Sequence, residues 1–229
     1  MFDLKGKLGH FRRPDTTGTH ATYPFISRTA LRGLLASVLG MEQLDDAGNF
    51  TALRLLSPIS TCTQEMSMLG KGFESGGTNS FNRPTAVEFI VNPYYRIYYT
   101  GKYIEDLAEK ISSGQSCYHT YLGSAFCLTF PEFVDMTEGI EVTWCDRIIT
   151  KTIVPTRIIS SLSFRKNIYY NRVSGMQYRY LGERQFENTI DFVYSDKDDP
   201  IEFVPLGKRE TCPISFIFAD VYGEILCLW

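Results

Sequence analysis

The stretch TYPFISRTALRGLLASVLG, residues 22–40, decides the fold of the first part of the chain. Its larger aliphatic side chains recur at the spacing of one helix face: Leu31, Leu34, Leu35, Val38 and Leu39. Ser27 is suited to cap the first turn of such a helix, and Gly40 is suited to end it. The sequence therefore predicts a helix that begins at Arg28, ends before Gly40 and packs one stripe against a core.

A strand and a polar loop precede this helix. Residues 2–11 alternate in polarity, which is typical of a strand. Residues 12–23 form a threonine-rich loop that contains Gly18, and Pro24 closes the loop. The first forty residues therefore predict a strand, a loop and a helix in succession.

The segments that follow complete an alternating order of elements. Strand-like runs occur at residues 53–66, 86–99 and about 125–130, and a short amphipathic helix is expected at about 103–111. The order strand, helix, strand, strand, helix, strand is the ferredoxin-like βαββαβ arrangement, which RNA recognition motifs share. The predicted fold class is therefore α+β with a ferredoxin-like, RRM-like core.

Two further regions set the domain organisation. Residues 67–84 are rich in glycine and lack periodic hydrophobicity, so they predict a hairpin tip or arm. Short β runs fill the last hundred residues, with an acidic loop at 195–200: residues 140–144, 148–154, 157–163, 176–181, 189–194 and 213–218. We expect a domain at residues 1–135, with its insert at about 67–84, and a β-rich region at 136–229 packed on it.

The charge is distributed unevenly along the chain. The formal net charge is −3 at pH 7, which alone argues against a nucleic-acid partner. Residues 1–40, however, hold six cations against two carboxylates, a balance of +4, so the remainder carries −7: Lys5, Lys7, Arg12, Arg13, Arg28 and Arg32 against Asp3 and Asp15. This asymmetry is typical of a protein that holds a polyanion at one face and meets protein partners elsewhere.

Metal, cofactor and membrane classes have little support in the sequence. The six cysteines include no C-x-x-C pair, and with three histidines they form no plausible zinc set. We expect reduced core cysteines, no metal and no cofactor. No run approaches the roughly 18 to 20 apolar residues that cross a bilayer, and the start lacks the apolar stretch of a secretory signal. The expected location is cytoplasmic, with no membrane partner.

The amino-terminal arginines are candidate phosphate ligands. Arg12 and Arg13 leave the predicted strand beside many hydroxyl groups, and guanidinium groups match phosphate oxygens. Arg28 and Arg32 lie four residues apart on one helix face. A cation in the first helical turn opposes the helix dipole, and a bound phosphate would reverse that penalty. A solvated turn and a local salt bridge to Asp15 are the alternatives.

The glycine-rich arm adds a second group of candidate ligands. Lys71, Phe73, Phe81 and Arg83 lie on it. Aromatic side chains on such an arm can stack on bases, and basic ones can follow the backbone. A linker without a ligand is the alternative.

Catalytic ingredients are sparse. His119, together with Tyr23, or His20 with Lys102, could serve general acid–base cleavage of RNA. A histidine outside a recognised constellation is usually structural or a simple donor. The sequence contains no P-loop, Rossmann fingerprint or G-x-S-x-G elbow. We therefore expect no catalytic residues, and we assign His119 to RNA binding.

Several of these segments resemble a known family. They are Gly9–Pro14 (GHFRRP), Thr22-Tyr23-Pro24, residues 27–35 (SRTALRGLL) with Leu39-Gly40, residues 89–98, which include NPYYRIY at 92–98, and Tyr121-Leu122-Gly123 with His119 before it. Together they resemble the "Cas five" subunits of type I CRISPR effector complexes, in the RAMP superfamily, over about residues 1–130. The pattern is closest to the I-B-like branch.

The resemblance implies both a fold and a role. Such subunits have an RRM-like core with a protruding β-hairpin thumb. They cap one end of the Cascade filament, hold the 5′ handle of the CRISPR RNA, and contact the backbone subunit and the large subunit, so target DNA is met indirectly. The implied RNA-binding residues are Arg12, Arg13, Tyr23, Arg28 and Arg32, to which physical reasoning adds Lys71, Phe81 and Arg83.

The same resemblance leaves two alternatives to a non-catalytic subunit. In the I-C-like branch this subunit itself cuts precursor CRISPR RNA with a Tyr, Lys and His set. Because Lys102 has no neighbouring histidine, cleavage is not expected here, and a metal-independent endoribonuclease stays the alternative. A structural adaptor that binds only protein is the third hypothesis.

Overall fold

The structure is a computed structural model that describes residues 1–16, 18–71, 80–142, 146–206 and 214–229. It is a mixed fold made mostly of strands, with two α-helices and five small antiparallel sheets among these residues. No helix in this part of the chain is long and apolar enough to cross a membrane. The predicted α+β class is confirmed at this level.

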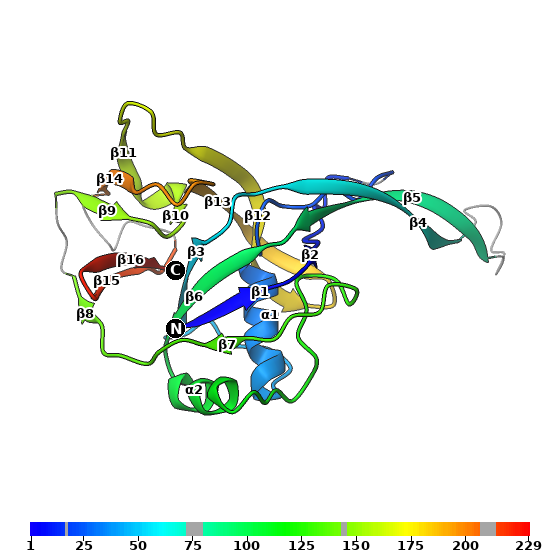
Figure 1. The fold of residues 1–229 in the computed structure, drawn as a ribbon, viewed down its shortest axis with the longest axis horizontal. Helices are drawn as coiled ribbons and strands as arrows, with labels where there is room; N and C mark the ends of the chain where they lie inside the picture. Colours follow the sequence, from blue (N-terminus) through cyan, green and yellow to red (C-terminus); the bar gives the residue numbers. More distant parts are fainter. Residues whose placement is uncertain (17, 72–79, 143–145, 207–213) are drawn as a thin grey trace.

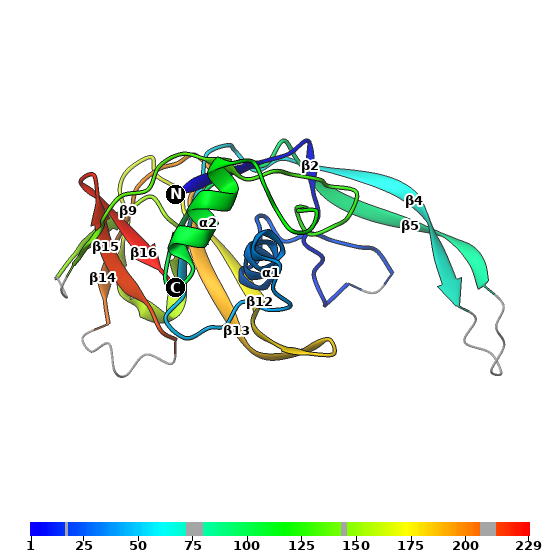
Figure 2. The same ribbon diagram turned by 90° about the horizontal axis from the view of Figure 1, so that it is seen from below.

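A four-stranded antiparallel sheet forms the amino-terminal part. It contains β1 (Phe2–Lys5), β3 (Phe50–Leu55), β6 (Tyr94–Thr100) and β7 (Glu132–Phe133), in the order β3-β6-β1-β7. The helices α1 (Arg28–Leu39) and α2 (Ile104–Ser112) contact each other and lie beside this sheet (Figures 1 and 2). Leu31 and Leu35 of α1 are fully buried, as the helical periodicity predicted.

Local chemistry explains the ends of α1. The Ser27 hydroxyl accepts a hydrogen bond from the Ala30 N–H at 3.3 Å, which satisfies one of the free donors of the first turn. Gly40 has φ 79°, the left-handed conformation that ends many helices. A Cβ atom there would also lie 2.8 Å from Cys117 Sγ. Both predicted ends of the helix are therefore confirmed.

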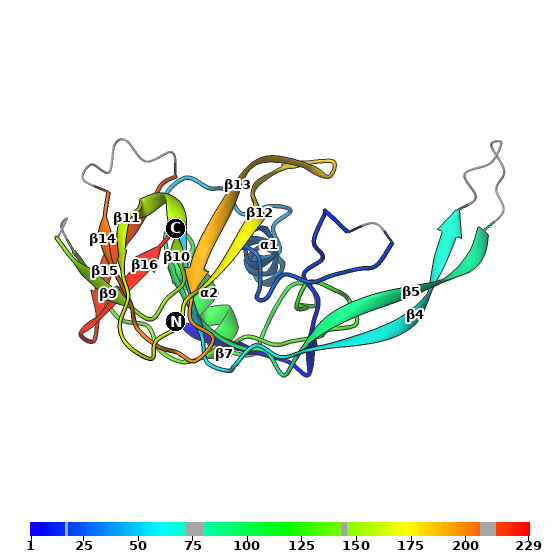
Figure 3. The ribbon, with the colours of Figure 1, turned by 90° about the horizontal axis from the view of Figure 1, so that it is seen from above.

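A long two-stranded hairpin extends away from the rest of the molecule (Figures 1 and 3). It consists of β4 (Thr61–Lys71) and β5 (Ser80–Val91), and β2 (Leu8–Gly9) pairs with the base of β5. Strand pairing extends through Lys71 and Ser80, so the ends of the predicted insert at 67–84 are strand rather than loop. Residues 72–79 lie outside the described part.

Three strand predictions need correction. The run at 53–66 is two strands, because Pro58 lies between β3 and β4 and cannot donate to a ladder. The run at 86–99 breaks at Asn92 and Pro93, where Asn92 has φ 48° and turns the chain. Residues 125–130 form no strand; the Cys127 N–H closes a turn onto the Ser124 carbonyl, and the edge strand is β7 instead.

The carboxyl-terminal region is β-rich, as predicted. Its strands form three further sheets with the orders β10-β13-β12, β11-β14-β9 and β16-β15-β8. The elements are β8 (Ile140–Glu141), β9 (Ile148–Thr150), β10 (Val154–Pro155), a 3-10 turn (Thr156–Ile158), β11 (Ile159–Ser163), β12 (Asn171–Gly182), β13 (Gln185–Tyr194), β14 (Ile201–Pro205), β15 (Ile217–Val221) and β16 (Glu224–Leu228). The sequence did not predict β14 and β16.

Buried aromatic rings join the two regions in one core. Phe192 on β13 is fully buried, with its ring 6.1 Å from Phe25 and 4.9 Å from Trp229. Arg54 on β3 adds a polar link, because its guanidinium group pairs with Asp198 at 2.6 Å and with Glu224 at 2.9 Å. The core therefore crosses the predicted boundary near residue 135.

Phe192→Ala tests whether the two regions unfold together. The substitution should lower the free energy of unfolding by roughly 3 to 5 kcal/mol, since it empties a filled core position. Denaturant unfolding followed by circular dichroism measures the change. Phe164→Ala, at a position 78% exposed, is the control and should change little. Separate transitions, with only the carboxyl-terminal one displaced, would contradict a shared core.

Candidate nucleic-acid interface

The loop between β2 and α1 is closed on itself by backbone hydrogen bonds. The Arg13 N–H donates to the Ala21 carbonyl at 2.9 Å, and the Tyr23 N–H donates to the Phe11 carbonyl at 2.8 Å. The Thr22 hydroxyl accepts from the Phe11 N–H at 2.9 Å. These bonds fix where the loop leaves the sheet and therefore where its arginines lie.

The same loop is attached to the base of the protruding hairpin. The His20 N–H donates to the Ala86 carbonyl at 2.8 Å, and the Glu88 N–H donates to the His20 carbonyl at 2.9 Å. The Thr22 N–H also donates to a Glu88 carboxylate oxygen at 3.0 Å. The loop and β5 therefore form one surface, although they are far apart in sequence.

Basic residues surround this junction, and we call Arg12, His20 and Arg83 the basic cluster. Arg12 and Arg83 are exposed, and neither forms an ion pair within the described part of the chain. Burial lowers the pKa of His20, and the nearby positive charges of Arg12 and Arg83 lower it further. Positive charges from both the strand-exit loop and the hairpin therefore act on the imidazole of His20.

A second histidine packs against His20. The His10 and His20 rings are stacked with centroids 6.3 Å apart. The His10 Nδ1 atom lies 2.7 Å from the Glu88 carbonyl oxygen, so Nδ1 carries a proton and donates it. Burial also lowers the pKa of His10. Both imidazoles are therefore neutral near pH 7.

Arg13 is already partly neutralised. Its guanidinium group makes a bidentate pair with Asp15, at 3.1 and 2.7 Å, on the surface of the loop. That pair raises the pKa of Arg13 and lowers the pKa of Asp15. A salt bridge to Asp15 was an alternative for the helix arginines, but the structure gives that carboxylate to Arg13.

Arg28 and Arg32 lie inside the protein, only 3% and 6% exposed. Both pair with one carboxylate oxygen of Asp46, at 2.8 Å from Arg28 and 3.0 Å from Arg32. Arg32 also donates to the backbone carbonyls of Asn49 and Asp45. The two guanidinium groups therefore hold residues 45–49 against α1, and their role as RNA ligands stays a prediction.

Arg28 and Tyr23 also attach the hairpin of β12 and β13 to the amino-terminal part. Arg28 donates to the Tyr178 carbonyl at 2.7 Å, and its guanidinium carbon lies 4.2 Å from the centre of the Tyr178 ring. Tyr23 is 5% exposed, and its hydroxyl donates to the Gly175 carbonyl at 2.6 Å. Two predicted ligand residues thus have structural partners on β12.

The remaining predicted ligands are not joined to the basic cluster. Lys71 and Phe81 pair within β4 and β5, but their side chains lie outside what the structure describes. His119 is exposed in the segment between α2 and β7, and no described contact connects it to Arg12 or Arg83. Of the predicted set, Arg12 and Arg83 both act on the imidazole of His20, and Arg13 lies on the same loop as Arg12.

Asp46 and Tyr178, the partners of Arg28, are not among the site residues that the sequence predicts. Asp46 lies in the short acidic segment that follows α1. The sequence alone does not distinguish a carboxylate that pairs with buried arginines from one that is exposed to solvent. Tyr178 lies 150 positions beyond Arg28 and belongs to β12, in the carboxyl-terminal region. No local sequence signal predicts either contact.

The amino-terminal segment is similar to a known protein family. Residues 1–63 match the family model described as "CRISPR-associated protein (Cas_Cas5)". The predicted resemblance to the Cas five family is confirmed. This Cas five segment runs from β1 into β4 and includes Arg12, Arg13, Tyr23, Arg28 and Arg32. Among curated proteins, none matches the sequence significantly.

Several solved structures have a similar fold. The chain is similar to "Crystal structure of a CRISPR protein from Archaeoglobus fulgidus", with 11% identity, coverage of 99% of this chain and 97% of that chain, and a TM-score of 0.54. It is similar to "CRISPR RNA-guided surveillance complex", with 13% identity, 89% and 90% coverage, and a TM-score of 0.51. A type III-B Cmr-beta structure bound to cognate target RNA and AMPPnP has 7% identity, 88% and 86% coverage, and a TM-score of 0.50. At these identities the likeness concerns the fold.

Asp46→Asn tests the structural role of the buried arginines. Removing the carboxylate charge leaves two buried guanidinium groups uncompensated, so the free energy of unfolding should fall by roughly 3 kcal/mol. Urea unfolding measures the change. Asp15→Asn is the matched control, because its exposed pair with Arg13 should contribute less than about 1 kcal/mol. Equal effects of the two substitutions would contradict the role assigned to Asp46.

Proposed function

We propose that this chain is a non-catalytic Cas five subunit of a type I, I-B-like CRISPR RNA-guided complex and that it holds the 5′ handle of the CRISPR RNA. The observation that carries the proposal is the basic cluster. Arg12, from the segment that matches the family, and Arg83 of the protruding hairpin both lower the pKa of His20, and neither arginine forms an ion pair within the described residues. The subunit acts in the cytoplasm.

The sheet order supports a ferredoxin-like, RRM-like core. β1 and β3, which α1 connects, are separated in the sheet by β6. β6 and β7, which α2 connects, are separated by β1. All neighbouring strands are antiparallel. This order supports a βαββαβ arrangement, in which the β4–β5 hairpin would be a thumb inserted between the second and third strands. Residues 1–135 form this domain, and 136–229 form the β-rich addition.

The chemistry of the basic cluster suits a single-stranded RNA backbone. Guanidinium groups donate charge-assisted hydrogen bonds to phosphate oxygens. The strands of the hairpin continue from this point away from the body of the protein (Figure 3). RNA held at Arg12 and Arg83 therefore has a track along the hairpin, where Lys71 and Phe81 are the proposed next contacts.

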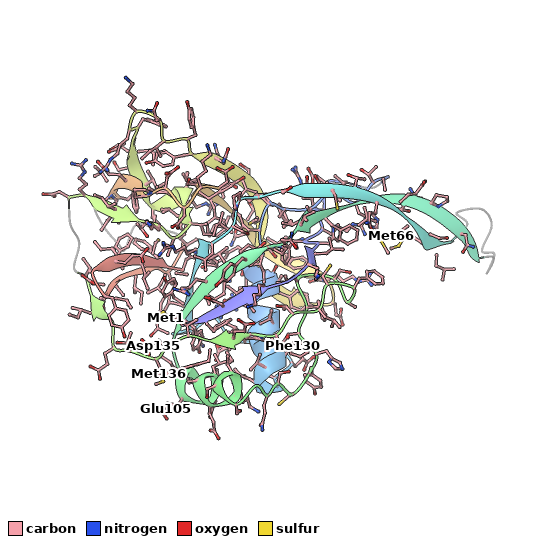
Figure 4. All side chains as sticks on the ribbon, in the orientation of Figure 1. Met1, Met66, Glu105, Phe130, Asp135 and Met136 are labelled. Atoms are coloured by element: carbon pink, nitrogen blue, oxygen red, sulfur yellow. The ribbon has the colours of Figure 1, made fainter. Side chains whose placement is uncertain are left out.

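Exposed apolar residues provide surface for protein partners. Phe126, Phe130, Met136 and Ile140 are 68%, 62%, 48% and 75% exposed. Phe130 and Met136 lie along the segment that connects the regions near β7 (Figure 4). Large exposed apolar side chains in one segment are typical of protein interfaces. We assign this face to the Cascade backbone subunit and the large subunit, through which target DNA is reached.

Arg12→Ala and Arg83→Ala test the RNA-binding role. Each substitution should weaken binding of labelled CRISPR repeat RNA by about 5- to 30-fold, the equivalent of roughly 1 to 2 kcal/mol. The slope of log affinity against log salt should fall by about 0.7 for each phosphate that the variant no longer neutralises. Filter binding at several salt concentrations measures both quantities. Arg172→Ala, which removes an exposed arginine paired with Asp191, is the control and should leave the slope unchanged.

One observation favours a metal-independent endoribonuclease as the second candidate. His10 and His20 are adjacent to Arg12 and Arg83, and a pair of imidazoles can supply the base and the acid for RNA cleavage. The lowered pKa values argue against it, because neither ring carries the second proton that an acid needs near pH 7. Tyr23 is also unsuited, since its hydroxyl is buried and bonded.

Incubation with labelled repeat RNA in EDTA separates the two candidates. We expect no specific cleavage product at pH 7, since the site lacks a charged acid. Specific cleavage that disappears in His20→Ala or His119→Ala would establish the enzyme instead. An unchanged thermal unfolding temperature of both variants is the control that separates a chemical defect from a folding defect.

A further inference from the structure

A pocket lies over the exposed face of α1, apart from the basic cluster. Its volume is about 370 Å³, which is within the range of small-ligand sites. Its floor is the exposed face of α1 around Gly33, and its walls are residues 42–46, the β12–β13 hairpin and the turn at 121–123. The hairpin passes beside α1 in both side views (Figures 2 and 3).

Gly33 forms part of the pocket floor, and the fold does not require glycine there. The residue is in the interior of α1, is exposed, and a Cβ atom added to it would meet nothing within 4 Å. Glycine in a helix interior is less favourable than alanine, because it loses more backbone entropy on folding. Open space over a bare helix backbone is suited to the close approach of a flat ligand.

One residue that lines the same pocket carries a buried, unpaired donor. Arg28 lines it and is 3% exposed, yet its Nε atom is buried without a hydrogen-bond partner among the described residues. The other guanidinium nitrogens are used by Asp46 and the Tyr178 carbonyl. Buried donors are rarely left unpaired in folded proteins. Because this atom is inaccessible in the structure, a ligand acceptor reaches it only if the Arg28 side chain moves.

The walls of the pocket favour an uncharged aromatic ligand. Tyr180 and Phe186 form a tilted ring pair with centroids 5.3 Å apart, and they are 38% and 37% exposed. Tyr121, in the turn on the other wall, is 45% exposed. The charged side chains of the lining balance, two cations against two carboxylates: Arg28, Arg32, Glu42 and Asp46. A flat ring with hydrogen-bond acceptors and no charge fits these surfaces.

We propose that this pocket binds one base splayed out of the single-stranded RNA, an inference that rests on the RNA-binding function proposed above. Protein recognition of single-stranded RNA stacks unpaired bases on aromatic side chains and hydrogen-bonds their edges. The turn that supplies Tyr121 is joined to the strand exit, because the His10 N–H donates to the Leu122 carbonyl at 2.9 Å. RNA held at Arg12 therefore passes next to a wall of the pocket.

Gly33→Leu tests the inference by filling the pocket from its floor. The probe is the CRISPR repeat RNA with an abasic nucleotide placed at each position in turn. In the original protein, one position should show an affinity decrease of about 5- to 150-fold, the range of one stacked base. In Gly33→Leu that decrease should vanish, because the base no longer enters. Such a double-mutant cycle isolates the contact between the base and the pocket.

Two further variants make the result specific. Glu109→Leu adds the same side chain to an exposed position of α2 and should preserve the abasic penalty. Tyr180→Ala combined with Phe186→Ala removes one wall without filling the space, and it should abolish the same penalty if Gly33→Leu does not fold. Thermal unfolding of each variant checks the fold.

The outcomes separate this inference from the proposed function. If the original protein binds no repeat RNA, the RNA-binding function fails and the base pocket fails with it. If RNA binds but no abasic penalty is removed by Gly33→Leu, the pocket inference alone is overturned. An unchanged RNA profile together with impaired assembly with other subunits would assign the pocket to a protein partner and would also overturn it.

Discussion

The carboxylate of Asp46 is the contact on which the arrangement of this protein depends. It accepts bonds from two guanidinium groups that α1 carries into the interior, and a third arginine, Arg179 of β12, approaches it at 3.3 Å. Burying a charged group without a partner is costly, so the helix arginines require this residue in place. Asp46 thereby joins α1, the segment after it and the β12–β13 hairpin.

This arrangement divides the arginines of the amino-terminal segment into two classes. Arg28 and Arg32 have their charges satisfied inside the fold, whereas Arg12 leaves the sheet into solvent beside Arg83. Arg13 is intermediate, since Asp15 neutralises it on the surface. Among the arginines of this segment, Arg12 alone is exposed without an ion pair in the described part of the chain. The local balance of +4 that the sequence shows overstates what is available to a phosphate backbone.

The sequence predicted the features that local chemistry controls. The bounds of α1 follow from the Ser27 cap, the Gly40 conformation and the leucine spacing, all within a dozen residues. Strand boundaries were less predictable, because periodicity does not reveal a break such as that at Asn92 and Pro93. The contacts of the site were also not predictable from local sequence. The partners of Arg28 are 18 and 150 positions away, and whether a guanidinium group is buried depends on those partners rather than on its neighbours in sequence.

The buried arginines and the exposed ones then contribute to one surface in different ways. By holding β12 beside α1, Arg28 and Tyr23 set the width of the space above Gly33 and orient the aromatic wall of Tyr180 and Phe186. Arg12 and Arg83 need no such support, because backbone bonds between the loop and β5 already fix them. A chain that held only the exposed cations would attract a polyanion without a defined register. A base pocket next to the strand exit supplies that register, since it holds one nucleotide at a fixed place relative to the exposed arginines.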